Sequence, residues 1–170
     1  LGFFKNDPEF KFHYFINKLI EKDNYIIDIG ANLGYYSRLF AQLAGKNGKI
    51  WSVEPVELYR SVLTKNTKKY KQVNIIPYAL GESGGFVEMG IPGNDIFRHG
   101  LTKVVSSSDE SYANVTRVEM KTPQEVFKDV DKLDYIKCDV EGYENHIIPQ
   151  IGFLLEKYKP ALQIELAAEN

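Results

Sequence analysis

The stretch Asp28-Ile29-Gly30-Ala31-Asn32-Leu33-Gly34 decides the fold of this chain. It overlaps the end of a short β-rich run, residues 25–29, which lacks polar alternation and is typical of a strand buried on both faces. Residues 35–44 then show helical periodicity, and Gly45 marks their end. The stretch is therefore predicted to be the turn of a strand–turn–helix unit.

Strand-like and helix-like segments alternate along the rest of the chain. Helices are predicted over residues 8–22, 35–44, 56–70 and 143–157, and strands over residues 25–29, 49–53, 73–78, 133–139 and 161–166. Such alternation favours an α/β fold with a mostly parallel sheet and helices on both faces. At 170 residues, the chain is predicted to form one domain, residues 1–170.

The middle of the chain changes character. Residues 81–111 hold several glycines and a serine run, typical of turns and loops around a short strand at 85–89. Residues 115–121 alternate and predict a second strand. We expect these two strands to pair as an inserted β-hairpin. Thr122, Pro123 and Glu125 then form a capping-box pattern that predicts a short helix to about residue 128.

Composition restricts the function classes. The single cysteine, Cys138, cannot form an internal disulfide, which suits a cytoplasmic protein. The net charge of −2 lacks the basic footprint of a nucleic-acid binder. No apolar run approaches the roughly 20 residues that a membrane helix needs. We therefore expect neither a nucleic-acid partner nor a membrane span, whereas the oligomeric state cannot be read from the sequence.

Parallel α/β sheets bind ligands outside the carboxyl ends of their strands, at the point where the strand order reverses. At the first such edge, Gly30 permits close approach of a ligand, and Gly34 permits close packing where the helix begins. Asn32 stands where the dinucleotide fingerprint has its second glycine, which argues against NAD. The alternative for the glycines alone is a tight turn that binds nothing.

The ends of the second and third strands add residues that could bind the two parts of a nucleoside. Glu54 follows the glycine turn by roughly 20 residues at a strand end, where a carboxylate can bind both hydroxyls of a ribose. Ala79 and Leu80 follow the third strand, where an adenine would lie, although ordinary strand-end packing explains them equally well. A single glutamate at a strand end is usually only a polar residue at the edge of the sheet. The prediction that Glu54 binds a ribose depends on its occurrence together with the glycine loop.

The fourth edge carries paired acids. If the chain stays extended, Lys137, Asp139 and Glu141 lie on one face of the strand. Three charges at the end of a buried strand are costly unless they are paired or bind something. Asp139 and Glu141 are therefore candidate bases. The alternative is a self-neutralising ion cluster, with Glu141 or Glu144 serving only to cap the next helix.

These motifs together resemble one known family. Asp28-Ile-Gly30-Ala-Asn32-Leu-Gly34, Val53-Glu54-Pro55 and Ile136-Lys137-Cys138-Asp139-Val140-Glu141-Gly142-Tyr-Glu144 are similar to the FkbM family of methyltransferases, with Thr122-Pro-Gln-Glu-Val-Phe and residues 160–165 in support. The likeness runs from about residue 9 to 167. The first motif occurs in many methyltransferases, whereas the Lys-x-Asp-x-Glu-Gly segment is much more specific to this family.

The resemblance implies a Rossmann-like class I methyltransferase fold with S-adenosylmethionine as cofactor. It implies methyl transfer to a hydroxyl, commonly of a sugar or secondary metabolite, so the expected partner is a small-molecule or glycan acceptor. The residues expected to bind the cofactor are Asp28, Gly30, Asn32, Gly34, Glu54, Ala79, Leu80 and Asp139. Class I domains usually continue into two more strands, so a truncation after the fifth core strand is also expected.

The catalytic prediction is Asp139 and Glu141, one of which takes the proton of the acceptor hydroxyl or orients it. We do not predict a divalent metal bound by these two acids, because two carboxylates alone are few ligands for such an ion. His146 is a rival base, although a histidine at that position is more often solvated. The alternative functions are a module that binds S-adenosylmethionine without catalysis and an NAD-dependent oxidoreductase.

Overall fold

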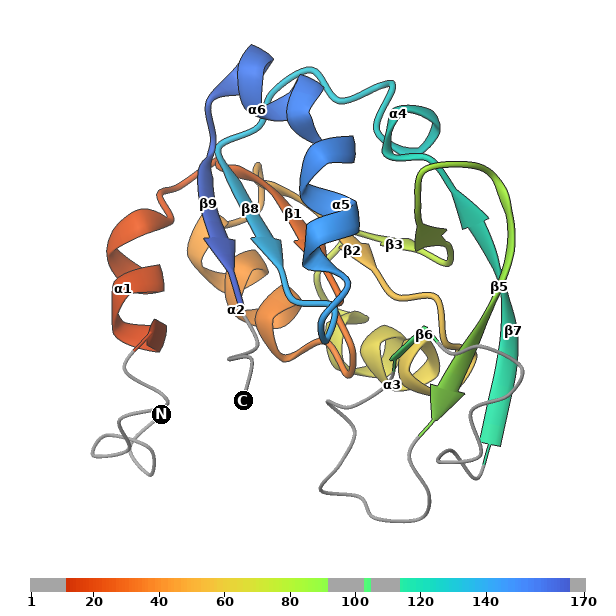
Figure 1. Ribbon diagram of the computed structural model, residues 1–170. Coiled ribbons are helices and arrows are strands. Elements are labelled where there is room, and N and C mark those ends of the chain that lie inside the picture. The colour runs from red at the N-terminus through yellow and green to blue at the C-terminus, as the bar shows by residue number, and fades with distance from the viewer. Residues whose placement is uncertain (1–11, 92–102, 105–113, 166–170) are drawn as a thin grey trace.

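The computed structural model describes residues 12–91, 103–104 and 114–165. Its core is a sheet of five parallel strands in the order β3-β2-β1-β8-β9 (Figure 1). The strands are β1 (Tyr25–Ile29), β2 (Lys49–Val53), β3 (Val73–Ile76), β8 (Tyr135–Cys138) and β9 (Ala161–Ile164). The strand order reverses at β1, which has β2 on one side and β8 on the other. The prediction of a parallel, Rossmann-like α/β sheet is confirmed.

Helices cover both faces of this sheet, with α5 in front of it and α2 behind it in Figure 1. They are α1 (Phe12–Leu19), α2 (Tyr35–Ala44), α3 (Glu57–Thr67), α4 (Pro123–Val126), α5 (Glu144–Gln150) and α6 (Gly152–Tyr158). Among the described residues, no helix combines the length and the apolar character needed to cross a membrane.

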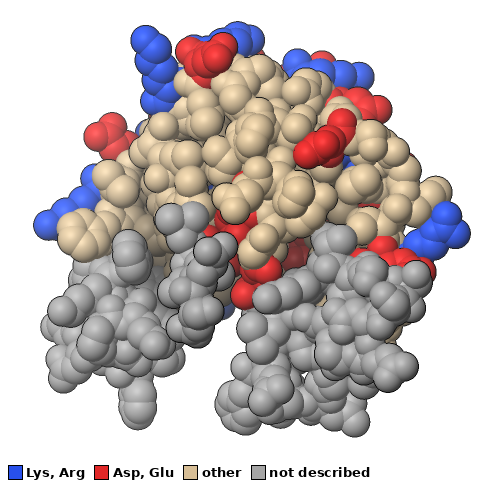
Figure 2. Space-filling view, in the orientation of Figure 1, with Lys and Arg blue, Asp and Glu red and all other residues tan. Residues whose placement is uncertain are grey.

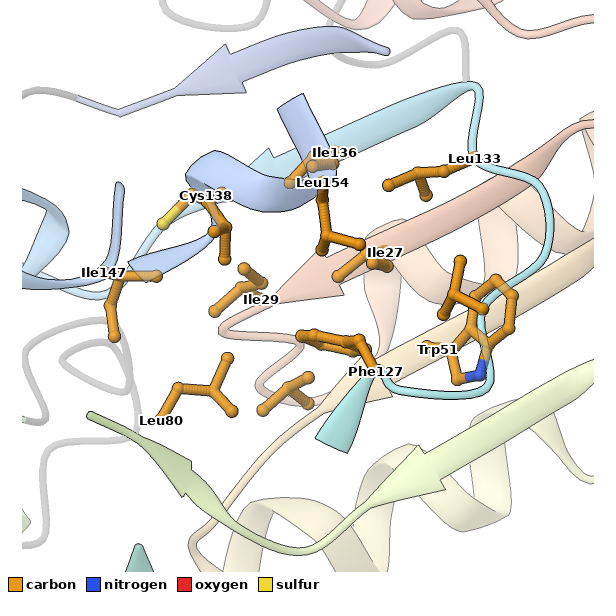
Figure 3. Packing of buried hydrophobic residues seen from close by; sticks show 13 residues of the cluster. Ile27, Ile29, Trp51, Leu80, Phe127, Leu133, Ile136, Cys138, Ile147 and Leu154 are labelled. Atoms are coloured by element: carbon orange, nitrogen blue, oxygen red, sulfur yellow. The ribbon is translucent and has the colours of Figure 1, made fainter. Parts of the chain in front are cut away.

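Alternation along β1 divides the core into two apolar clusters. Ile26 faces α1 and α2, where it packs with Ile16, Phe40 and Tyr135. The other cluster lies under α4, α5 and α6 and is drawn in Figure 3; its labelled members are Ile27, Ile29, Trp51, Leu80, Phe127, Leu133, Ile136, Cys138, Ile147 and Leu154. Because both faces of the sheet are covered, the strand ends alone are left for a ligand.

A second, smaller sheet is inserted between β3 and β8. Its order is β4-β7-β5-β6, formed by β4 (Ala79–Leu80), β5 (Gly85–Ile91), β6 (Lys103–Val104) and β7 (Asn114–Lys121). The predicted pairing is confirmed: β5 and β7 are antiparallel, with Val87 opposite Val118. The sequence did not predict β4 or β6, because strands of two residues carry no readable periodicity.

Several predicted boundaries change for local reasons. The helix predicted over 143–157 is two helices, since Pro149 cannot donate a backbone hydrogen bond and the chain turns at Ile151. The strand predicted to residue 78 ends at Ile76, just before Pro77. The helix predicted over 56–70 is Glu57–Thr67, and the strand predicted over 133–139 is Tyr135–Cys138.

Two other predicted elements are only partly visible. Of the helix predicted over 8–22, residues 8–11 lie outside the described residues, and α1 ends at Leu19. Residue 166, the predicted end of the last strand, also lies outside them. The predicted capping box is confirmed, since Glu125 Oε2 accepts from the Thr122 N–H at 2.9 Å and Thr122 Oγ1 accepts from the Glu125 N–H at 3.3 Å.

Candidate functional site

A pocket of about 620 Å³ lies at the carboxyl ends of the core strands. Its volume is within the range of small-molecule and cofactor sites. Its walls include Gly30–Leu33 after β1, Val53–Pro55 at the end of β2, Tyr78–Leu80 before the inserted sheet and Asp139–Glu141 after β8. The structure therefore brings the four predicted edges together around one space, at the point where the strand order reverses.

The glycine loop is shaped by protein contacts. Gly30 has a φ of 78°, and a Cβ atom there would overlap the backbone carbonyl oxygen of Asp139. Gly34 has a φ of 84°, and a Cβ there would collide with Leu63 of α3. Gly34 thus serves the close helix packing expected of it. Gly30 lines the pocket, but its closest constraint is the end of β8, which the sequence could not show.

Glu54 lies in the pocket wall with 5% of its surface exposed. Its Oε2 accepts a hydrogen bond from the Asn32 N–H, and its Oε1 accepts one from the Val56 N–H, both at 2.9 Å. Burial raises the pKa of Glu54 to about 7, against the opposing effect of these two bonds and of Arg60. Each carboxylate oxygen has two acceptor positions, so each retains one for a ligand hydroxyl.

The third edge is held by the inserted sheet. Ala79 and Leu80 are buried, line the pocket and pair in parallel with Met120 and Lys121 of β7. From the same sheet, Met89 of β5 also reaches the pocket. Sequence reasoning missed Met89, since its alternating strand gave no sign of which face meets the site.

The fourth edge contains a buried ion cluster. Lys137 is 2% exposed, and its Nζ lies 2.9 Å from Asp139 Oδ2 and 3.9 Å from Asp28 Oδ1. Burial opposes charge on Lys137, but Asp28 and Asp139 outweigh it and raise its pKa, so the ammonium is charged. Asp28 also accepts a hydrogen bond of 2.6 Å from Ser37 Oγ. Asp28 therefore lies behind the pocket wall, and it reaches the site through Lys137.

The loop after β8 departs from the extended course assumed in the sequence analysis. Glu141 has a φ of 54° and Gly142 a φ of 95°, so the chain turns at the third charge. Lys137, Asp139 and Glu141 all line the pocket, but they are not on one face of a straight strand. Glu144 holds this turn, because its carboxylate accepts from the N–H groups of Val140 at 2.8 Å and Gly142 at 3.0 Å.

His146 and Cys138 lie near the site but make contacts that are structural rather than catalytic. The ring of His146 is stacked on Tyr143 at 4.4 Å, and its Nδ1 lies 3.7 Å from Glu82 Oε1. His146 is not among the residues that line the pocket. Cys138 is fully buried, and burial raises the pKa of its thiol to about 12, as expected for a core residue rather than a nucleophile.

Charge is distributed unevenly around the site. Figure 2 shows acidic side chains gathered at the lower centre, on the side to which the arrows of β8 and β9 point in Figure 1. Lysine and arginine side chains lie toward the outer margin of this view. Within the described part of the chain, no three His, Cys, Asp or Glu residues are grouped closely enough to hold a metal ion.

Comparisons with known proteins find chains to which this one is similar. A curated protein from Methanosarcina mazei, a protein-L-isoaspartate O-methyltransferase, is 39% identical over 70 residues, which cover 40% of this chain and 26% of that protein. Aeropyrum pernix fibrillarin, solved with natively bound S-adenosyl-L-methionine, is 11% identical with a TM-score of 0.49, covering 82% of this chain and 43% of fibrillarin. A methyltransferase from Aquifex aeolicus is 13% identical with a TM-score of 0.47, covering 93% and 67%.

The family comparison extends over most of the chain. The model of the Methyltransferase FkbM domain matches residues 28–170, which include the glycine loop, Glu54 and the segment from Lys137 to Glu144. These are the motifs on which the resemblance rested, and the structure places them around one pocket. The chain belongs to the FkbM family of methyltransferases.

Proposed function

We propose that this protein is an S-adenosylmethionine-dependent methyltransferase that methylates an oxygen atom of a small-molecule or glycan acceptor. The observation that carries the proposal is the buried Glu54 carboxylate beside the glycine loop, in a pocket at the reversal of strand order. When bound, S-adenosylmethionine supplies a methyl group on a positively charged sulfur. The residues on the four edges suit that cofactor in shape and in charge.

The cofactor is assigned to five groups of the pocket wall. Glu54 accepts hydrogen bonds from the two ribose hydroxyls, and Gly30 and Asn32 form the floor. Ala79 and Leu80 supply an apolar wall for the base. Asp28 and Gly34 act indirectly, since Asp28 fixes Lys137 and Gly34 seats the loop on α3. Asp139 is the last of the eight residues predicted to bind the cofactor, and it is assigned to the end of the cofactor that carries the methyl group.

Asp139 is the better supported of the two candidate bases. The ammonium of Lys137 fixes its carboxylate at 2.9 Å, while 22% of the Asp139 side chain remains exposed and the residue lines the pocket. A base that is fixed yet accessible can accept the proton of an acceptor hydroxyl as the new O–C bond forms. Glu141, on the turn that follows, is assigned to orient that hydroxyl.

The acceptor assignment rests on charge and on one relative. Among the described lining residues, the charged groups are Glu54, Asp139 and Glu141, with Lys137 already paired. This lining disfavours a phosphate-bearing acceptor such as a nucleic acid. The name of the M. mazei relative, an O-methyltransferase, favours oxygen as the acceptor atom. A sugar or secondary-metabolite hydroxyl and a cytoplasmic location stay predictions.

Two competing functions are less well supported. An NAD-dependent oxidoreductase would need close backbone approach to a pyrophosphate at the position that Asn32 occupies. A module that only binds S-adenosylmethionine would have no need for an accessible carboxylate fixed by a buried lysine. Asp139 and Lys137 thus favour catalysis over binding alone.

The test begins with the cofactor. Isothermal calorimetry should detect binding of S-adenosylhomocysteine and none of NAD, and Glu54→Gln should weaken the former by about 10- to 100-fold, as expected for loss of a charged hydrogen-bond acceptor. Glu156→Gln, on the exposed side of α6, is the matched control. A panel of methyl glycosides, polyols and phenols with radiolabelled S-adenosylmethionine then tests transfer. Equal binding by Glu54→Gln and the control overturns the cofactor site.

A further inference from the structure

The ends of β8 and β9 bring a second acid beside Asp139. The two strands are parallel neighbours with Cys138 opposite Ile164, and the Glu165 N–H donates to the Cys138 carbonyl at 3.1 Å. Asp139 and Glu165 directly follow the paired residues Cys138 and Ile164, so that they are neighbours at the ends of the two strands. The carboxyl group of Asp139 is close enough to raise the pKa of Glu165 through a side-chain hydrogen bond. We name these two residues the acid pair.

A hydrogen bond between two carboxyl groups requires a proton on one of them, because an ionised carboxylate only accepts. Partial burial and the negative charge of Asp139 raise the pKa of Glu165, and the hydrogen bond to Asp139 acts in the same direction. The Asp139 carboxylate already accepts from the Lys137 ammonium at 2.9 Å. The proton of the pair therefore resides on Glu165, which donates it to Asp139.

The two members of the pair face different surroundings. Asp139 lines the pocket, whereas Glu165 is an exposed residue and is not among the residues that line it. One carboxyl group thus meets the ligand space, and the other meets solvent. A proton can cross from pocket to solvent by passing between them.

We propose that the acid pair is a proton exit path for the methyl transfer assigned above, with Glu165 as a further residue of the catalytic machinery. When the acceptor oxygen takes the methyl group, the methyl–sulfur bond of S-adenosylmethionine would break with its electron pair left on sulfur, and S-adenosylhomocysteine would be the leaving group. The O–H bond of the acceptor breaks at the same time, and its proton passes to Asp139. Glu165 releases its own proton to water, and the hydrogen bond of the pair reverses direction. Asp139 then passes the proton that it received to Glu165, which restores the starting state with Asp139 ionised and Glu165 protonated. One proton has entered the pair from the acceptor and one has left it to water.

Among the described residues, charged and titratable groups of β1, α2, β8 and α5 surround the pair. Lys137 of β8 lowers the pKa of Glu165, whereas Glu144 of α5 raises it. Asp28 of β1 lies 3.9 Å from Lys137 Nζ, and the ring of Tyr36 on α2 lies 4.7 Å from the same atom. The lysine is thus shared between two acids, which leaves the second negative charge of the pair uncompensated and favours retention of a proton.

The shared proton is tested by ¹³C NMR titration of the Glu165 carboxyl carbon in the full chain, a measurement that requires neither cofactor nor acceptor. Asp139→Asn removes the negative partner and is expected to lower the titration midpoint of Glu165 by about one pH unit. Glu156→Gln should leave the midpoint unchanged. If Asp139→Asn does not fold, the Asp139 resonance of the wild type must shift over the pH interval in which Glu165 titrates. Equal midpoints, or no such shift, overturn the proposal.

The role in catalysis rests on the proposed function and is tested separately. With the panel compound that is methylated, Glu165→Gln should lower kcat about tenfold with KM unchanged, and Glu165→Asp should restore most of the loss. Binding of S-adenosylhomocysteine should equal that of the wild type in both variants. Unchanged kcat from pH 5 to 9 in Glu165→Gln overturns the exit path. Failure of the wild type to bind S-adenosylhomocysteine instead overturns the proposed function, and the titration remains readable.

Discussion

Glu54 and Asp139 lie on opposite sides of β1, at the ends of β2 and β8, and their carboxylates are held by different means. Glu54 is fixed by two backbone N–H groups, whereas Asp139 is fixed by the ammonium of Lys137 and the carboxyl group of Glu165. The backbone donors on the Glu54 side do not titrate, so they hold the carboxyl group in one position even though its own pKa is about 7. The Asp139 side is built from groups that exchange protons, which suits chemistry.

The largest expected effect comes from removing the cation on the Asp139 side. Lys137→Met leaves Asp28 and Asp139 without their shared ammonium, and breaking a buried pair in this way costs about 3–5 kcal/mol. Urea unfolding measures the loss. Lys132→Met is the control, because Lys132 pairs with Asp134 near the surface at 3.2 Å and should lose less than about 1 kcal/mol. Equal losses would mean that the buried cluster adds no stability.

A smaller effect is expected where the two sides of the pocket meet. Gly30→Ala places a methyl group against the Asp139 carbonyl at a positive φ, so that the ends of β1 and β8 must separate. We expect a loss of about 2–3 kcal/mol in unfolding free energy. Gly142→Ala isolates the conformational part, about 1 kcal/mol, since Gly142 has a φ of 95° and open space around it. A loss from Gly142→Ala as large as that from Gly30→Ala would contradict the close contact.

The Glu54 side predicts a pH dependence of cofactor binding. The pKa of Glu54 is about 7 because burial disfavours the charged form, and ribose hydroxyls donate to that charged form. Binding then requires loss of a proton below pH 7, so affinity for S-adenosylhomocysteine should fall about tenfold from pH 8 to pH 6, or about 1.4 kcal/mol. Calorimetry in buffers of different ionisation enthalpy measures the released proton. A constant affinity across this range would exclude a protonated Glu54 in the unliganded protein.

The two sides also differ in how far the sequence could predict them. The glycine loop and Glu54 follow from local spacing, because a strand–turn–helix unit and an acid after the next strand define their positions. Glu165 directly follows β9 and Met89 lies on β5, and their proximity to the site depends on the pairing of β8 with β9 and on the inserted sheet. The turn at Glu141 was also missed, since no glycine occupies that position of positive φ. Tertiary pairing and local strain therefore set the limit.

The smallest effect concerns the turn that separates Asp139 from α5. The carboxylate of Glu144 accepts from the N–H groups of Val140 and Gly142, and Glu144→Gln keeps one acceptor oxygen while it turns the other into a donor. We expect a loss of about 1 kcal/mol in unfolding free energy, measured by urea titration, with weaker methyl transfer and unchanged binding of S-adenosylhomocysteine.

Glu125→Gln is the matched control for Glu144→Gln, because Glu125 likewise accepts from a backbone N–H group, that of Thr122, but lies away from the pocket. It should cost similar stability without affecting methyl transfer. If Glu144→Gln instead weakens cofactor binding as strongly as Glu54→Gln, the turn after β8 holds the cofactor as well. The division between a fixed cofactor side and a proton-exchanging acceptor side would then be wrong, because one loop would serve both.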